Sequence, residues 1–289
     1  MRAHKKNILN ILEVVILIYL NKICLGKSNL LVSRLCFGTE PFTIVKGPIG
    51  KKSQGDRSPQ EAGEILKKAF RKGINFWDTS VDYLSHSHVA EGLKKVNRKD
   101  VIITDKSHAM TYEEGENAID LSLNELGTDY LDIMMLHNVP LKTHWVKTKM
   151  VIETVPLQKR MGALKAFSDA KDSGKVKALG LSTHSTQVLK QTLEVPEIDV
   201  VLTVLNKNGS LIEDGSLSEH IEMIKNVRDS GKGIYVCKVI DAGKLRIEGE
   251  SAIKFVLQYQ SFIHAFNIGM YSIEDVIKNI SLFEEVLGN

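Results

Sequence analysis

Eight short apolar segments recur along the chain, and segments with a helical pattern separate them. Most are rich in Val, Ile and Leu without strict alternation, as in strands buried on both faces of a parallel sheet. They span residues 35–39, 74–80, 100–106, 130–137, 176–184, 199–206, 233–239 and 264–270. An amphipathic segment follows each one, and several of these begin at a Ser or Thr cap signal and end at Gly. Eight strand–helix units in about 250 residues predict an α/β fold, a single (β/α)8 TIM barrel.

An open, doubly wound sheet is the alternative architecture. It is disfavoured because no Gly-x-Gly-x-x-Gly motif follows the first predicted strand. Two connections are longer than the others, residues 40–57 after the first strand and 139–156 after the fourth. Long loops after barrel strands lie at the C-terminal face, where active sites form. We therefore expect residues 25–289 to form one barrel domain whose two long loops line the substrate pocket. Trp77 and Trp145 are candidate apolar walls, and Trp77 could equally face the barrel core.

Residues 1–24 form an extension with its own pattern. An apolar run from residue 8 to residue 20, broken by Asn10 and Glu13, follows a basic start. The run is shorter than the roughly 20 apolar residues of a membrane-spanning helix, and no small-residue cleavage site follows it. An extra element packed on the barrel, or a mis-assigned start, is the favoured interpretation. Targeting or membrane anchoring is the alternative.

Composition narrows the class of protein. The 289 residues include 38 basic and 35 acidic side chains, a net charge of +3, and no basic run interleaved with aromatics that would favour nucleic-acid binding. Hydrophobic residues make up 43% of the chain, enough to argue against disorder. Cys24, Cys36 and Cys237 lie far apart without a Cys-x-x-Cys spacing, so we expect a reducing compartment, the cytoplasm, and no cysteine-ligated metal.

Polar residues stand where the predicted strands end. Asp78, Lys106 and His137 end three successive strands, and Tyr83 follows Asp78 by five residues. These ends converge on one rim of a barrel. A lysine charge beside the phenol would lower the pKa of Tyr83 from its reference of about 10, and Asp78 would orient that lysine. Each residue alone could be a cap, a solvated charge or a structural histidine, but the four together predict proton transfer to a carbonyl oxygen.

The chain resembles the aldo/keto reductase family from about residue 25 to residue 279. The segment "GINFWDTSVDY" carries Asp78 and Tyr83 at the family's five-residue spacing, "VIITDKS" carries Lys106, and "LGTDYLDIMMLHNV" carries His137. "SGKVKALGLSTHS" is similar to the fifth-strand segment, and "FNIGMYSIEDVIKNI" to the last strand and the cofactor-binding helix. The resemblance implies an NAD(P)(H)-dependent oxidoreductase that interconverts an aldehyde or ketone and an alcohol. Tyr83 would be the proton donor and His137 would orient the carbonyl.

The resemblance also implies where NADP(H) or NAD(H) would bind. The implied contacts are Ser182, Thr183, Asn206, Cys237, Lys238, Gly269, Met270, Asp275 and Asn279. Gly269 and Asp275 stand where many NADPH-dependent members have a Lys and an Arg that hold the 2′-phosphate. A carboxylate would repel that phosphate, although Lys278 could partly substitute for the missing cations. We therefore expect NADH to serve at least as well as NADPH.

Two other interpretations compete with this one. A metal-dependent amidohydrolase barrel would use an equivalent set of residues, His86, His88, Lys106, His137, His184 and Asp241. It is disfavoured because its His-x-His pair must lie on a strand, whereas "HSH" here precedes a helix, and we expect no metal site. His86 and His88 are then expected to be solvated or to approach the substrate, and Asp82 to be a solvated loop carboxylate.

A barrel that binds nicotinamide without turnover, as a regulatory or channel subunit, is the second competing interpretation. The four polar groups at the rim argue against it, because a scaffold has no physical need for all of them. The expected partner is a small carbonyl or alcohol substrate, with no nucleic acid. Membrane association is expected only through residues 8–20, and the assembly is expected to be a monomer or a small homo-oligomer.

Overall fold

Eight parallel strands close into a barrel in the computed structural model, which describes residues 22–46, 52–54, 57–147 and 151–288. The barrel strands are β3 (Leu35–Gly38), β6 (Phe76–Asp78), β7 (Ile102–Ser107), β8 (Leu131–Leu136), β11 (Val176–Thr183), β12 (Val200–Val204), β13 (Gly233–Cys237) and β14 (Ala265–Gly269). They follow one another in chain order around the ring, and β14 pairs with β3 to close it. The predicted single (β/α)8 barrel is confirmed.

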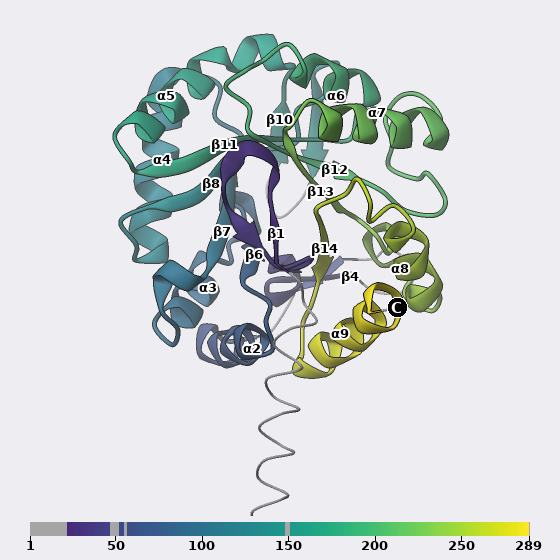
Figure 1. Ribbon diagram of the computed structural model, residues 1–289. Helices are drawn as coiled ribbons and strands as arrows, with labels where there is room; N and C mark the ends of the chain where they lie inside the picture. The colour runs from purple at the N-terminus through teal and green to yellow at the C-terminus, as the bar shows by residue number, and fades with distance from the viewer. Residues whose placement is uncertain (1–21, 47–51, 55–56, 148–150, 289) are drawn as a thin grey trace, which may run out of the picture.

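A helix follows every barrel strand, and the helices form a ring around the barrel (Figure 1). They are α2 (Pro59–Arg71), α3 (His86–Leu93), α4 (Tyr112–Leu126), α5 (Met161–Asp172), α6 (Thr186–Thr192), α7 (Leu217–Asp229), α8 (Gly249–Leu257) and α9 (Ile273–Leu287). Capping boxes begin four of them, at Ser58, Thr111, Ser216 and Ser272. These side chains satisfy amide groups that a helix start leaves without intrahelical partners.

The core has two layers, one inside the barrel and one between barrel and helices. Because side chains alternate along a strand, neighbouring residues enter different layers. Phe76 fills the barrel interior, while Trp77 is fully buried in the outer layer and its Nε1 donates to the Ile74 carbonyl at 3.1 Å. Of the two alternatives for Trp77, a pocket wall or the core, the structure thus shows a core residue.

A hairpin of β1 (Ile23–Cys24) and β2 (Leu31–Val32) lies across one end of the barrel, in purple in Figure 1. Leu25, Leu30 and Val32 belong to the interior cluster, so the hairpin seals that end with apolar side chains. The apolar run of residues 8–20 lies outside the described residues. Within the described ranges, no helix is long and apolar enough to cross a membrane.

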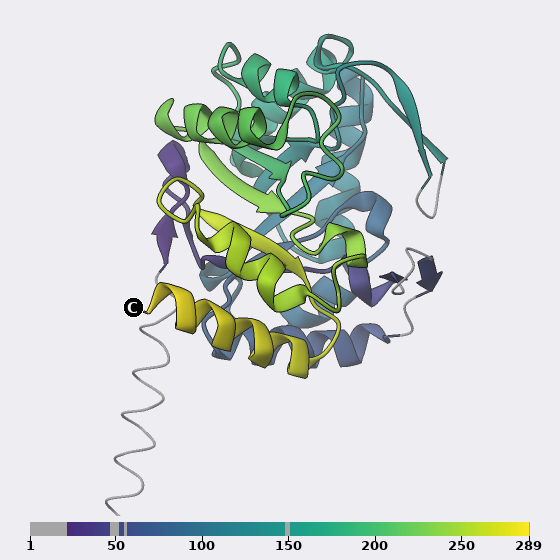
Figure 2. The ribbon, with the colours of Figure 1, turned by 90° about the vertical axis from the view of Figure 1, so that its right-hand side faces the viewer.

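The two long connections contain hairpins of their own. Residues 40–57 include β4 (Ile44–Lys46) and β5 (Lys52–Gln54), and residues 139–156 include β9 (His144–Lys147) and β10 (Val151–Thr154). Both pairs lie on the side toward which the barrel strands point (Figure 2). Trp145, on β9, is 66% exposed. The loops thus stand at the expected face of the barrel.

Candidate active site

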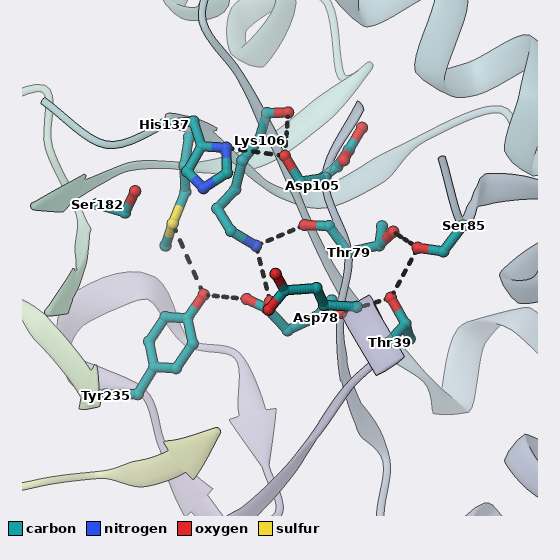
Figure 3. Close-up of polar contacts among 12 residues, drawn as sticks. Thr39, Asp78, Thr79, Ser85, Asp105, Lys106, His137, Ser182 and Tyr235 are labelled. Atoms are coloured by element: carbon teal, nitrogen blue, oxygen red, sulfur yellow. Dashed lines mark hydrogen bonds and ion pairs between the residues drawn. The ribbon is translucent and has the colours of Figure 1, made fainter. Parts of the chain in front are cut away.

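An ion pair lies inside the C-terminal end of the barrel. The Lys106 ammonium, on β7, donates to Asp78 Oδ1 at 2.7 Å and to the Thr79 carbonyl at 2.5 Å, and the side chains of both Lys106 and Asp78 are buried (Figure 3). Tyr235, on β13, donates its hydroxyl to Asp78 Oδ2 at 2.8 Å. Both carboxylate oxygens of Asp78 are thus engaged, so the pair can exist without water.

Tyr83 lies beside this pair, at the end of a 3₁₀ turn, η3 (Val81–Tyr83). Its ring centroid is 5.0 Å from the Lys106 ammonium, and its ring meets that of His137 edge-on at 5.7 Å. Burial, together with the Asp78 and Glu40 carboxylates, raises the pKa of Tyr83 well above its usual value. The expectation that Lys106 lowers this pKa is therefore wrong. The lysine charge is paired with a carboxylate, and Tyr83 remains a protonated acid.

His137 follows β8 directly and is held from two sides. Its Nδ1 lies 2.9 Å from Asp82 Oδ1 and 2.9 Å from the Ser80 hydroxyl, which also donates to Asp82. Asp82 is 3% exposed, so the expected solvated loop carboxylate is in fact buried against a histidine. The His108 ring lies 4.6 Å from that of His137.

A buried arginine fixes the loops that carry these groups. Arg160, in η5 (Leu157–Arg160), donates to the carbonyls of Ala109, His137 and Ser107 at 2.9, 2.7 and 2.5 Å. Burial lowers its pKa to about 9. Because three carbonyls from two loops share one guanidinium, the positions of the segments after β7 and β8 are coupled.

A cavity of about 610 Å³ opens beside the ion pair. Seven of the predicted site residues line it: Asp78, Tyr83, Cys237, Lys238, Gly269, Asp275 and Asn279. Lys106 and His137 are not among the residues that line it. The cavity thus runs from the Tyr83 ring to the start of α9.

Comparisons with known proteins identify the family of this chain. Residues 34–260 match the Aldo/keto reductase family. The chain belongs to the aldo/keto reductase family. L-galactose dehydrogenase of Arabidopsis thaliana is 26% identical, over 91% of this chain and 88% of that protein. NADH-specific methylglyoxal reductase of Escherichia coli is 24% identical, over 78% of this chain and 69% of that protein.

A solved structure supports the fold. The holo form of an aldo-keto reductase from Bacillus halodurans superposes with a TM-score of 0.68 at 21% identity, covering 92% of this chain and 91% of that one. The chain is accordingly an NAD(P)H-dependent oxidoreductase, and the interpretation as a binding subunit without turnover is set aside.

The cavity of this reductase fits a dinucleotide cofactor. Two glycines, Gly38 and Gly269, line the cavity where the wall leaves no room for a side chain. A Cβ on Gly38 would lie 2.6 Å from Asn267 Oδ1, and one on Gly269 would lie 2.8 Å from Pro41. Within the described residues, the buried Asn267 Oδ1 has no hydrogen-bond partner, so it offers an acceptor to a ligand. Three cations line the same cavity, Lys238, Arg246 and Lys278. Such a donor set suits a negatively charged dinucleotide.

Four predicted cofactor contacts do not line the cavity. Ser182 Oγ accepts the Asn138 amide at 2.7 Å. Thr183 donates to the Val139 carbonyl at 2.7 Å, and the Asn206 amide group bonds within its own turn, to Ser210. Met270 belongs to the outer core. The side chains of Thr183, Asn206 and Met270 are therefore held within the protein, whereas the Ser182 hydroxyl only accepts in this bond and keeps its own proton to donate.

His86 and His88 are buried parts of the scaffold, contrary to expectation. The His86 ring lies 3.1 Å from Asp105 Oδ1 and 2.7 Å from Glu125 Oε2. Burial alone would lower its pKa, but the two carboxylates raise it to about 9. His88 Nε2 bonds the Arg57 carbonyl at 2.9 Å.

The residues required by the amidohydrolase interpretation do not assemble. His184 bonds the Leu211 carbonyl at 3.1 Å, and Asp241 lies 3.7 Å from the Lys244 ammonium. Among the described residues, the donor atoms of Asp82, His108 and His137 do come within 4.8 Å of one another. That group contains only one member of the predicted metal set, and two of its members are bonded to each other. The chain belongs to the aldo/keto reductases instead, so the amidohydrolase interpretation is set aside.

Sequence reasoning missed four residues that shape the site: Ser80, Asp82, Arg160 and Tyr235. Asp82 had a usable signal, because it directly precedes Tyr83 in a short turn after a barrel strand. Tyr235 had another, since it stands two residues before the cavity residue Cys237 and therefore shares its inward face. Arg160 had none, because its three carbonyl partners come from distant parts of the sequence.

Proposed function

We propose that Tyr83 is the proton donor of this reductase and that Asp78, Lys106 and His137 form the rest of its catalytic group. A bound nicotinamide supplies the hydride that reaches the carbonyl carbon. Tyr83 gives its phenolic proton to the carbonyl oxygen, which becomes the alcohol hydroxyl. The observation that carries the proposal is the Tyr83 phenol, kept protonated by burial at the wall of the cavity, next to the buried Lys106–Asp78 pair.

The paired lysine has an electrostatic part in this scheme. As the proton leaves Tyr83, negative charge develops on the phenol oxygen, and the Lys106 ammonium lies 5.0 Å from the ring centroid. A fixed cation in a site that excludes water stabilises such charge without reorganisation. Asp78 and the Thr79 carbonyl hold the ammonium in place, and Tyr235 in turn holds Asp78.

The test is Tyr83→Phe, measured with a panel of aldehydes and ketones. We expect kcat to fall about 10²- to 10⁴-fold, the range of a lost general acid, while the fluorescence titration of NADH binding stays nearly unchanged. Tyr259→Phe, a change in a ring that packs between Phe255 and Phe262, is the matched control. A Tyr83→Phe enzyme with full kcat would refute the role.

We infer further that NADH serves at least as well as NADPH. The Asp275 carboxylate lines the cavity and is fixed there, because it accepts the amides of Tyr271 and Ser272 at 2.9 and 3.0 Å. Gly269 has no side chain with which to hold a phosphate. Lys278 and Arg246, from the same lining, are the cations that a 2′-phosphate would need to recruit. The Escherichia coli relative, by its name, is NADH-specific.

The ratio of kcat/KM for the two cofactors tests this preference. We expect NADH to equal or exceed NADPH, and Asp275→Asn to move the ratio toward NADPH because it removes the repelling charge. A hundredfold preference of the unaltered enzyme for NADPH would contradict the inference.

The remaining proposals concern the setting of the protein. Three free cysteines fit a reducing compartment, and we propose the cytoplasm. We also propose one barrel domain over residues 25–289, acting as a monomer or small homo-oligomer. Sedimentation of the full chain, and of a chain lacking residues 1–24, tests the domain bounds and the oligomeric state.

A further inference from the structure

His137 has one ring nitrogen engaged by the protein and the other available to a substrate. Nδ1 lies 2.9 Å from both Asp82 Oδ1 and the Ser80 hydroxyl. Within the described part of the chain, Nε2 forms no hydrogen bond, and the side chain keeps 13% of its surface exposed beside the Tyr83 ring. A neutral imidazole carries a proton on only one nitrogen, so the partners of Nδ1 decide what Nε2 offers.

Both partners of Nδ1 are acceptors. Burial alone would raise the pKa of Asp82, but the charge of His137 and the hydrogen bonds of His108 and His137 hold it well below its usual value. The carboxylate is therefore ionised and has no proton to donate. The Ser80 hydroxyl has two other acceptors for its single proton, Asp82 Oδ1 and the Lys106 carbonyl, so it too accepts from the ring. Nδ1 must then carry the proton.

We propose that Asp82 is a positioning residue that keeps the His137 proton on Nδ1. Nε2 then accepts a hydrogen bond from an alcohol when the ring is neutral, and donates one to a carbonyl oxygen only when the ring holds a second proton. This inference rests on the proposed function, and it takes His137 as the member of the catalytic group that meets the substrate oxygen. Asp82 itself does not touch the substrate.

The two substrates should therefore respond to pH in opposite ways. A carbonyl oxygen has lone pairs only, and it faces the lone pair of Nε2 unless the ring is an imidazolium. An alcohol hydroxyl has a proton to give, and it suits the neutral ring. The Asp82 carboxylate compensates the charge of the imidazolium. A protonated ring therefore favours carbonyl binding, and a neutral ring favours alcohol binding.

Other charged groups near this ring keep their states over the relevant range. Burial lowers the pKa of His108 to about 4 and that of His184 to about 3, so both are neutral. Arg160, with a pKa of about 9, remains a cation. Tyr83 stays protonated, and Lys106 and Asp78 are paired with each other.

Asp82→Asn tests the proposal, because the amide can donate to Nδ1 and so allows the ring proton to move to Nε2. With 4-nitrobenzaldehyde as the probe, we expect the KM of the unaltered enzyme to rise tenfold or more between pH 5.5 and pH 8.5. In Asp82→Asn the change should be less than threefold. The matched control is Asp105→Asn, which alters the other buried carboxylate–histidine pair, on the outer side of β7. It should keep the slope of the unaltered enzyme.

A second measurement needs no turnover. Long-range ¹H–¹⁵N correlation spectra of the full chain, labelled at histidine and assigned with His137→Gln, report the ring tautomer directly. We expect neutral His137 to be protonated on Nδ1 in the unaltered protein and on Nε2 in Asp82→Asn. A proton on Nε2 in the unaltered protein, or an unchanged KM slope in Asp82→Asn, would overturn the proposal. If no carbonyl is reduced at all, the proposed function fails while these spectra still decide the role of Asp82.

Discussion

Replacing Tyr235 by Phe removes one oxygen atom from the barrel interior and nothing else. The ring is fully buried and packs 5.0 Å from that of Phe76, so a Phe fills the same space. The lost atom donates to the ionised Asp78 at 2.8 Å. A hydrogen bond to a charged group contributes about 1.5–3 kcal/mol, and its loss leaves a buried carboxylate oxygen without a donor. We expect the free energy of unfolding to fall by about 2 kcal/mol.

Urea titration followed by circular dichroism measures this loss, and kinetics accompany it. We expect kcat to fall by less than tenfold, because the Lys106 ammonium keeps its bonds to Asp78 Oδ1 and Thr79. Tyr259→Phe is again the control, since no hydrogen bond joins the Tyr259 hydroxyl to a described residue. If Tyr235→Phe costs no more than this control, Asp78 does not depend on Tyr235.

Three further outcomes are expected. Lys106→Met leaves its buried carboxylate partner uncompensated, so it should cost about 3–5 kcal/mol of stability and lower kcat more than a hundredfold, as urea titration and kinetics would show. His86 has a raised pKa of about 9 against 6.5 in the unfolded chain, so its pairing with Asp105 and Glu125 stabilises fully below about pH 6.5. That stabilisation, about 3 kcal/mol, is lost as pH rises through 9, and the difference in unfolding free energy from His86→Gln should shrink accordingly. A chelator should leave carbonyl reduction unchanged; its loss on dialysis against EDTA, with recovery on added zinc, would revive a metal mechanism.

The barrel and its rim follow from local pattern. Strands buried on both faces leave runs of Val, Ile and Leu, and in each of the eight runs the observed strand lies within one or a few residues of the predicted one. The end of each apolar run predicts where its strand ends, and parallel strands all end on the same side of the barrel. Asp78, Lys106 and His137 could therefore be expected to meet, and the structure brings them together with Tyr83.

The pKa values and charge pairs of the site could not be predicted from local sequence pattern. Whether Lys106 lowers the pKa of Tyr83 depends on what else holds the ammonium, and the Tyr235–Asp78 contact joins residues 157 apart in the chain. Asp82 was mistaken for a surface group because a 3₁₀ turn can direct a side chain inward or outward. Thr183 and Ser182 were both predicted to contact the cofactor, but neighbouring side chains on one strand face opposite ways. The strand pattern alone therefore argues against one of the two contacts.

The hairpin that seals the barrel makes closure of this fold a late event. The Gly26 amide donates to His264 Nε2 at 3.2 Å, and the Lys27 amide donates to the Gly231 carbonyl at 2.9 Å. During synthesis, the residues that receive the hairpin emerge more than 200 positions after it. Until then Leu25, Leu30 and Val32 have no complete apolar surface to cover, and contacts so distant in sequence form slowly. A nascent chain of this reductase therefore keeps these hairpin residues exposed almost until translation ends, a period in which a chaperone would have most to protect.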